Sequence, residues 1–182
     1  MHPIIETATD VGMTREHNED SFLAIDDQKE IPSLDALLVV ADGMGGHAAG
    51  EIASSTAVRH IQDRLASGDF LGLSPEALLA DLQTLVEDVN KVVYTDGQDP
   101  DKYGMGTTCT LVGVKDRVIY YCHVGDSRLY ILREGHLEQV TKDHSWVEEA
   151  VDMGLLTRDE AHSHPRRNII TRAIGLTPEV EV

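Results

Sequence analysis

Hydrophobic positions in the first half of the chain change from the period of a strand to that of a helix. Residues 3–10 alternate weakly between apolar and polar, and the runs 21–25 and 35–41 are short and apolar, so all three predict strands. Apolar residues at three- and four-residue spacing then predict a helix from about 48 to 66. A second helix is predicted to open at Ser74, which is followed by proline in the first helical position.

The second half of the chain returns to strand patterns joined by tight turns. Consecutive hairpins favour antiparallel pairing, and strands that precede and follow a block of helices favour an α+β fold over alternating α/β. The turns are predicted at Lys115-Asp116 and Glu134-Gly135. The predicted strands cover 107–114, 117–124, 128–133 and 136–140, and short helices are predicted over 144–153 and 157–161.

Composition narrows the class of protein. The chain has 182 residues with a formal net charge of −17, which suits one acidic domain spanning 1–182. Such a charge repels a phosphate backbone, so nucleic-acid binding is not expected. No apolar run approaches the length of a membrane span and no signal peptide opens the chain, which predicts a cytoplasmic protein. Cys109 and Cys122 lie in apolar runs and are expected to be reduced and buried.

The most informative local pattern begins where the strand 35–41 ends. A carboxylate at Asp42 is costly at the end of an apolar strand unless it is paired or bound to a cation. Gly43 exposes backbone and could offer its carbonyl oxygen to a hard cation. His47 precedes the predicted helix and could act as a general acid. The alternative interpretation is an N-cap aspartate followed by a flexible turn.

Two further acidic clusters allow both a functional and an ordinary interpretation. Glu19 and Asp20 are adjacent, so on a strand one could bind a metal directly while the other orients a metal-bound water. Arg15 offers a planar fork that matches a phosphate group. A solvated charge cluster is the alternative. Asp126 again lies at a strand end, where a turn aspartate bonded to its own backbone is equally compatible.

Other motifs carry a weaker chemical signal. Residues 104–108 (Gly-Met-Gly-Thr-Thr) and 168–175 contain patterns typical of close backbone packing. His162 and His164 could bind a metal, but their position beside Pro165 favours a solvent-exposed loop.

Six motifs in order resemble the metal-dependent Ser/Thr protein phosphatases, the PPM or type 2C family, in their bacterial form. They are Arg-x-x-Asn-Glu-Asp, Asp-Gly-Met-Gly-Gly-His-x-x-Gly-Glu, Gly-Met-Gly-Thr-Thr, Val-Gly-Asp-Ser-Arg, Thr-x-Asp-His-Ser and Ile-Thr-Arg-Ala-Ile-Gly. The resemblance runs from about residue 5 to 182. It implies two packed antiparallel sheets flanked by helix pairs, an αββα sandwich, with a metal centre at one end between the sheets.

The resemblance also implies an activity and its cofactors. The expected reaction is hydrolysis of phosphoserine and phosphothreonine in proteins by a metal-activated water, supported by two or three Mn²⁺ or Mg²⁺ ions. The expected partners are phosphorylated substrates and the Ser/Thr kinases that the enzyme opposes, with neither nucleic acid nor membrane. A noncatalytic regulatory module that binds phosphoproteins is the alternative.

Roles carry over by residue from the same resemblance. Asp42 would bridge two metal ions and the Gly43 carbonyl would bind one of them. Glu19 would be a ligand, directly or through water, and Asp20 would hydrogen-bond metal-bound water. Arg15 would bind the substrate phosphate, and His47 would protonate the leaving oxygen. Asp126 would help to hold a third metal ion.

The chain departs from the family pattern after Gly175. Members continue through a Ser-Asp-Gly motif and an Asp-Asn-x-Thr motif, each of which supplies an aspartate to the metals, and neither occurs before Val182. Three interpretations stay open: a fragment of a longer protein, a short form completed by a partner chain, and a degenerate binding module. Residues 145–166 correspond to the family's flap segment and are expected to shape substrate access.

Overall fold

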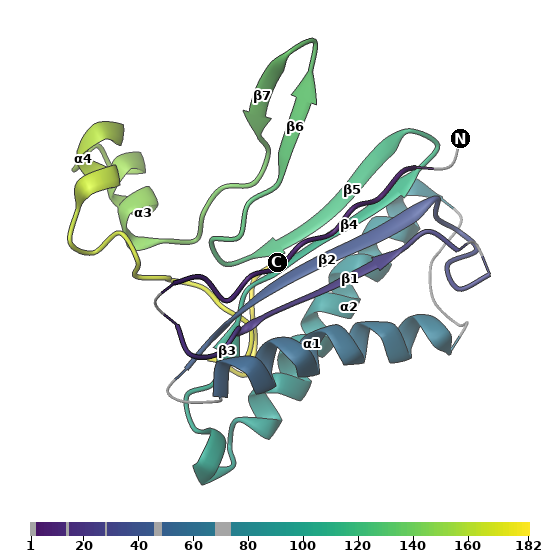
Figure 1. The fold of residues 1–182 in the computed structure, drawn as a ribbon, viewed down its shortest axis with the longest axis horizontal. Coiled ribbons are helices and arrows are strands. Elements are labelled where there is room, and N and C mark those ends of the chain that lie inside the picture. The colour runs from purple at the N-terminus through teal and green to yellow at the C-terminus, as the bar shows by residue number, and fades with distance from the viewer. Residues whose placement is uncertain (1–2, 14, 28, 46–48, 68–73) are drawn as a thin grey trace.

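The computed structural model describes residues 3–13, 15–27, 29–45, 49–67 and 74–182. Its centre is a five-stranded antiparallel sheet in the order β1-β2-β4-β5, with the short β3 paired to the end of β2. Two long helices, α1 and α2, lie together on one face of this sheet (Figure 1). The elements are β1 (Asp20–Ile25), β2 (Ala36–Met44), β3 (Gly106–Thr107), β4 (Cys109–Lys115), β5 (Val118–Val124), α1 (Ala49–Ala66) and α2 (Pro75–Asp96).

Alternation along β2 explains how the sheet meets the helices. Leu37, Val39 and Ala41 are buried against α1 and α2, while Val40 between them is exposed. The predicted helix start at Ser74 is confirmed, because the Ser74 side chain accepts a hydrogen bond from the backbone N–H of Ala77 at 3.2 Å. The core therefore lies between one sheet face and one helix pair.

The two cysteines lie in this core. Both are buried and free, as expected from the sequence. Burial raises the pKa of the Cys109 thiol to about 12 and that of Cys122 to about 11. Both thiols are therefore protonated and inert near neutral pH.

The chain after β5 leaves the sheet. Strands β6 (Tyr130–Arg133) and β7 (His136–Gln139) form a separate hairpin that projects from the sheet, and α3 (Trp146–Asp152) and α4 (Arg158–Ser163) lie beyond it (Figure 1). The predicted turn at Glu134-Gly135 is confirmed by positive φ angles of 50° and 80°. A short 3₁₀ helix, η1 (Pro100–Lys102), links α2 to β3. The order of strands and helices confirms the α+β class.

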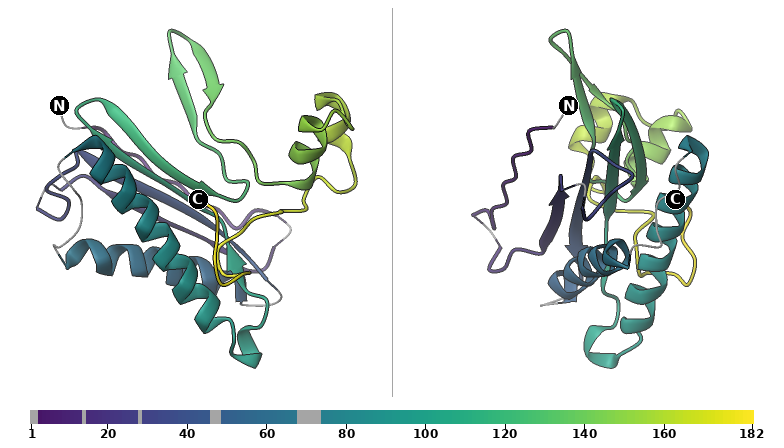
Figure 2. Two further views of the ribbon diagram at one scale, coloured as in Figure 1. Left: turned by 180° about the vertical axis from the view of Figure 1, so that it is seen from behind. Right: turned by 90° about the vertical axis from the view of Figure 1, so that its right-hand side faces the viewer.

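Two local predictions were wrong. Residues 3–10 are extended but form no strand: within the described residues they lie near β1 and β2 without pairing with either strand, so no ladder of backbone hydrogen bonds forms. Figure 2 shows this segment running beside the sheet on the side away from α2. The β4–β5 turn also lies one residue later than predicted: Lys115 pairs with Val118, and Asp116 and Arg117 have φ angles of 51° and 66°.

None of the helices in the described part of the chain has both the length and the apolar character that crossing a bilayer requires.

Candidate metal centre

Two carboxylates face each other at the end of the sheet. Asp20 and Asp42 occupy directly opposite positions of the β1–β2 ladder, so their side chains emerge on the same face. Like charges in this position repel, so the pair is stable only if it shares a proton or meets a positive charge.

The electrostatics of Asp42 reflect that repulsion. Loss of hydration, followed by the charges of Asp20 and Asp126, raises the pKa of Asp42 to about 6, and Arg15 partly opposes this shift. Burial, followed by the charge of Asp143, raises the pKa of Asp126. Three acidic side chains from β1, β2 and the loop after β5 thus share one electrostatic environment.

Two buried threonines hold the main chain of Asp42. The Thr108 hydroxyl accepts a hydrogen bond from the backbone N–H of Asp42 at 2.9 Å, and the Thr107 hydroxyl donates to the Asp42 carbonyl at 3.0 Å. Thr108 Oγ1 also lies 2.7 Å from the hydroxyl of Ser127, in the loop that carries Asp126. Thr108 therefore connects two of the three acids.

The sequence did not reveal this role. The motif 104–108 was interpreted as close backbone packing, and Gly106 does fit that interpretation, since a Cβ there would lie 3.0 Å from the Ile174 carbonyl oxygen. The available signal was the placement of two adjacent hydroxyls directly before the mainly apolar run that begins with Cys109. Buried hydroxyls need partners, and the partners here are the backbone groups of Asp42.

Glu19 lies between the sheet and the start of α1. Its carboxylate forms an ion pair with Arg15, and its carbonyl oxygen accepts hydrogen bonds from Gly43 N–H at 3.0 Å and from Ser54 Oγ at 2.6 Å. A Cβ on Gly50 would lie 2.7 Å from Glu19 Oε1, so only glycine allows the carboxylate to approach the helix backbone. The roles of Glu19 and Arg15 toward metal and phosphate stay predictions.

The Arg15 side chain is open to solvent. Its exposed fraction is 68%, against 10% for the Glu19 side chain with which it pairs. A guanidinium carries five N–H donors, so one carboxylate partner leaves others facing outward. Such a group can contact an anion that approaches the centre.

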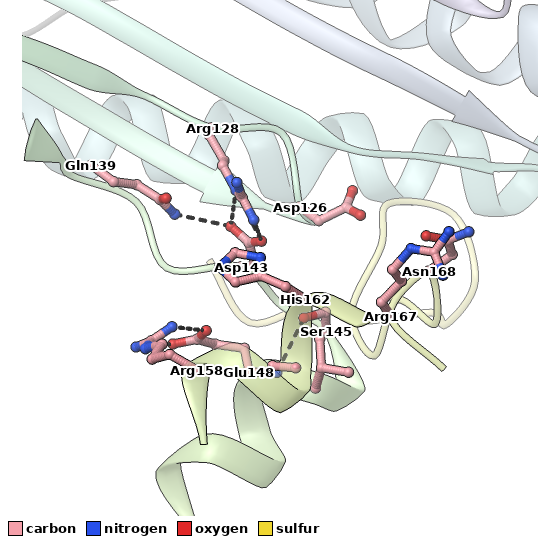
Figure 3. Close-up of a pocket in the computed structure, with 12 residues that line it drawn as sticks. Asp126, Arg128, Gln139, Asp143, Ser145, Glu148, Arg158, His162, Arg167 and Asn168 are labelled. Carbon is pink, nitrogen blue, oxygen red and sulfur yellow. Dashed lines mark hydrogen bonds and ion pairs between the residues drawn. The ribbon is translucent and has the colours of Figure 1, made fainter. Parts of the chain in front are cut away.

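A cavity of about 600 Å³ adjoins the loop that carries Asp126 (Figure 3). Asp143 lies in its wall and binds Arg128 through two nitrogens, at 2.6 to 3.0 Å. Helices α3 and α4 supply the opposite wall, where Arg158 pairs with Glu148. The segment 145–166, predicted to shape access, thus contributes both helices that border this cavity; its function as a flap stays a prediction.

The two histidines of the 162–164 segment differ. His162 is exposed, as predicted, and lies on the cavity wall. His164 is only partly exposed and stacks on Trp146 with ring centroids 4.8 Å apart, so the prediction of a solvent-exposed loop was wrong for this residue. The local sequence does not show that Trp146, 18 residues earlier, lies close enough to pack against this ring. His47, the predicted general acid, lies outside the described residues.

The donors present suit a hard cation. Carboxylates and a glycine carbonyl are the oxygen ligands that Mg²⁺ and Mn²⁺ prefer, and a bound cation would relieve the repulsion within the Asp20–Asp42 pair. Across the described ranges, no three His, Cys, Asp or Glu side chains form a closed ligand set. The centre is therefore an open carboxylate pair with Asp126 beside it, which fits an ion that keeps several water ligands.

Known proteins share this architecture. Residues 14–176 match the family model described as Protein phosphatase 2C. The chain belongs to the protein phosphatase 2C family. This finding confirms the family that the six sequence motifs indicated.

Two bacterial proteins illustrate the similarity. The chain is 39% identical over 179 residues to a protein of Listeria monocytogenes named serine/threonine phosphatase stp, covering 97% of this chain and 69% of the relative. The crystal structure of serine/threonine phosphatase Stp1 from Staphylococcus aureus aligns with a TM-score of 0.86 at 35% identity, covering 96% of this chain and 66% of that one. The chain therefore spans about two thirds of these relatives.

One structural neighbour contains metal. The catalytic domain of the serine/threonine protein phosphatase PstP, solved in complex with two manganese ions, aligns with a TM-score of 0.71 at 39% identity, over 93% of this chain and 66% of that one. Metal dependence is thus a property of the family to which this phosphatase belongs.

Proposed function

We propose that this chain hydrolyses phosphoserine and phosphothreonine esters in proteins, using a water activated by Mn²⁺ or Mg²⁺ at the Asp20–Asp42 centre. The observation that carries the proposal is the pairing of two carboxylates at one end of the sheet in a member of the protein phosphatase 2C family. The names of the relatives as serine/threonine phosphatases support this substrate class and favour catalysis over a noncatalytic binding module.

The chain's own residues divide the work. Asp42 and the Gly43 carbonyl would hold the ions. Glu19 would bind directly or through water, and Asp126 would help to hold a third ion. Asp20 would accept a hydrogen bond from coordinated water. When bound, a pair of divalent ions lowers the pKa of a shared water and neutralises charge on the phosphoryl group.

A cationic side chain and a proton donor would complete the reaction. Arg15 binds the substrate phosphate with the donors that Glu19 leaves free. His47 protonates the serine or threonine oxygen as it leaves. Physiological substrates are expected among cytoplasmic proteins that Ser/Thr kinases phosphorylate, and neither nucleic acid nor membrane is an expected partner.

The test is metal-dependent turnover by the purified chain. p-Nitrophenyl phosphate and a phosphothreonine peptide are hydrolysed over a titration of Mn²⁺, with Asp42→Asn as the variant. Loss of a group that only orients a metal ligand costs about 10- to 100-fold, so removal of the Asp42 carboxylate is expected to cost at least about 100-fold in rate. The control is Asp63→Asn, which changes an exposed aspartate of α1 far from the centre and should leave the rate unchanged.

Two outcomes contradict the proposal. Turnover that does not depend on metal, or that survives Asp42→Asn, would remove the assigned centre. Phosphopeptide binding without any turnover by the wild-type chain would favour the noncatalytic module.

A further inference from the structure

A pair of histidines lies beside the loop that carries Asp126, and neither has a part in the function proposed above. His123 is the last residue but one of β5 and is 7% exposed, while His144 follows β7 in the sequence. Their ring centroids are 4.9 Å apart with a 32° angle between the planes. The two rings are tilted against each other, His123 buried and His144 partly buried, and this arrangement needs an explanation because each ring has two polar nitrogens to satisfy.

His144 holds Gly125, the residue directly before Asp126, at both of its backbone polar groups. The His144 backbone N–H donates to the Gly125 carbonyl at 2.8 Å. The Gly125 N–H donates to His144 Nδ1 at 3.1 Å. Because one residue fixes both groups, it fixes the direction in which the chain leaves β5 and enters Asp126.

Gly125 has no freedom to compensate for the loss of this contact. It is buried with a φ of 113°, and a Cβ there would lie 2.5 Å from Thr108 Cγ2. Thr108 is the same side chain that contacts the backbone of Asp42. The loop is therefore clamped between Thr108 on one side and His144 on the other.

His144 is itself held from several directions. Its carbonyl accepts a hydrogen bond from Thr171 N–H at 2.9 Å, and its Nε2 lies 3.2 Å from Arg172 Nη1. Behind it, His123 lies 2.9 Å from Thr110 Oγ1 through Nδ1 and 3.2 Å from the Lys142 carbonyl through Nε2. The ring is therefore a fixed support.

The tautomer of His144 follows from its neighbours. A backbone N–H can only donate, so Nδ1 must accept from Gly125, and the neutral ring then carries its proton on Nε2. Arg172 also only donates, so its contact with Nε2 is not a hydrogen bond in this tautomer. Arg172 has another partner, the Glu181 carboxylate at 2.6 Å, whereas the buried Gly125 N–H needs the imidazole.

We propose that His144 is a positioning residue that orients Asp126, by accepting the Gly125 N–H at Nδ1 and donating its own N–H to the Gly125 carbonyl. This inference rests on the proposed function, because it assigns to Asp126 a place at the metal centre. His144 touches neither substrate nor reacting atoms in this assignment. Its effect passes through two atoms of the Gly125 backbone.

A pair of near-isosteric substitutions separates the two ring nitrogens. In His144→Asn, the amide oxygen can occupy the place of Nδ1 and accept from Gly125; in His144→Gln, the longer side chain places its polar group near the position of Nε2. The first readout is the hydrogen-exchange rate of the Gly125 amide by NMR. The second is the rate of Mn²⁺-supported hydrolysis of p-nitrophenyl phosphate as a function of Mn²⁺ concentration.

The expected result is an asymmetry between the two variants. His144→Gln should expose the Gly125 amide to exchange and lower metal-supported turnover by about 10- to 100-fold, the usual effect of removing a group that orients a metal ligand. His144→Asn should retain Gly125 protection and most of the turnover. The control His136→Gln, at an exposed position of β7, should match wild type in both measurements.

Each other outcome overturns the proposal. Equal loss in the Asn and Gln variants would show that the ring matters only by packing, and equal retention would show that it does not matter. If His144→Asn lost turnover and Gly125 protection while His144→Gln kept both, the role would belong to Nε2. Ring ¹⁵N shifts of the wild-type chain add a test that needs no variant: a proton on Nδ1 of His144 contradicts the assignment.

The two proposals fail in different ways. Absence of Mn²⁺-dependent turnover in the wild-type chain would contradict the proposed function, while Gly125 exchange would still report whether His144 holds the loop. If the function holds, Asp126→Asn and His144→Gln combined should lower turnover no further than Asp126→Asn alone, because both act through one carboxylate. Additive losses would show that His144 acts elsewhere.

Discussion

The two faces of the five-stranded sheet are built from the same strands but do different things. On the helix side, Leu37 and Val39 of β2 are at most 1% exposed. On the opposite side, Val40 is 48% exposed and its cross-strand partner Phe22 is 39% exposed. One face is a packed core, and the other leaves some of its apolar side chains exposed.

The chemistry lies on the open face. Moving along the β1–β2 ladder on that side, the pair Phe22–Val40 is followed by the pair Asp20–Asp42. His123 of β5 belongs to the same face, since its neighbours Cys122 and Val124 point into the core. The core that stabilises the fold and the candidate metal centre therefore lie on opposite sides of one sheet. A site at the end of a rigid strand is held more precisely than one on a loop.

The largest expected effect is at Gly43, a buried residue of β2 next to Asp42. A Cβ there would lie 2.1 Å from the Gly50 carbonyl oxygen and 2.6 Å from that of Glu19, both backbone atoms that cannot turn aside. Gly43→Ala should lower the free energy of unfolding by about 3 kcal/mol or more, because α1 must move away from β2. The measurement is the urea midpoint of the metal-free chain.

Gly113→Ala is the matched control on the helix side. Its added Cβ would meet only side-chain atoms of Leu34 and Leu82, at 3.4 Å, so the change should stay within about 1 kcal/mol. Similar losses for the two glycines would contradict the close contact assigned to Gly43.

The next effect compares adjacent valines of β2. Val39→Ala removes two methyl groups from the core and should cost about 2 to 3 kcal/mol, while Val40→Ala on the open face should cost less than about 1 kcal/mol. Urea unfolding of both variants gives the comparison. Equal costs would mean that the open face is covered in solution.

The smallest effect concerns pH. Burial, followed by the charges of Arg172 and His123, lowers the pKa of His144 from 6.5 to about 4, against the opposing charges of Glu181 and Asp143. Since the unfolded chain binds the proton more tightly, this residue's contribution to stability is full above pH 6.5 and is lost as pH falls toward 4. The loss should be about 1 kcal/mol, because the ring is partly exposed and solvent screens the interaction.

Urea unfolding at pH 7.5 and 4.5 checks this sign. The difference between wild type and His144→Asn isolates the histidine from carboxylates that titrate in the same range. His136→Asn should reproduce the wild-type profile. A wild type that gains stability relative to His144→Asn on acidification would contradict the assigned pKa direction.

Much of the fold could be predicted from local pattern, and the failures share a cause. Helices α1 and α2, the β6–β7 turn and most strands follow from periodicity and caps, which act over a few residues. The segment 3–10 failed because a strand requires a partner as well as an alternating sequence. Asn90 shows the same limit, because it is buried among the apolar residues of α2. Its amide oxygen accepts a hydrogen bond from Gly175 N–H at 2.8 Å, and its amide nitrogen donates to the Thr177 carbonyl at 3.1 Å.

For the candidate site, the sequence by itself determined the family and predicted Glu19, Asp20, Asp42 and Asp126 as the acids of the centre. Only the tertiary structure decided which of them meet. Register places Asp20 opposite Asp42, and the returning chain brings Thr108 to the Ser127 hydroxyl and His144 to the Gly125 backbone, on either side of Asp126. The physical reason is range: residue chemistry and periodicity are local properties, whereas a shared electrostatic environment and a hydrogen-bonded clamp form between segments that meet only when the chain is folded.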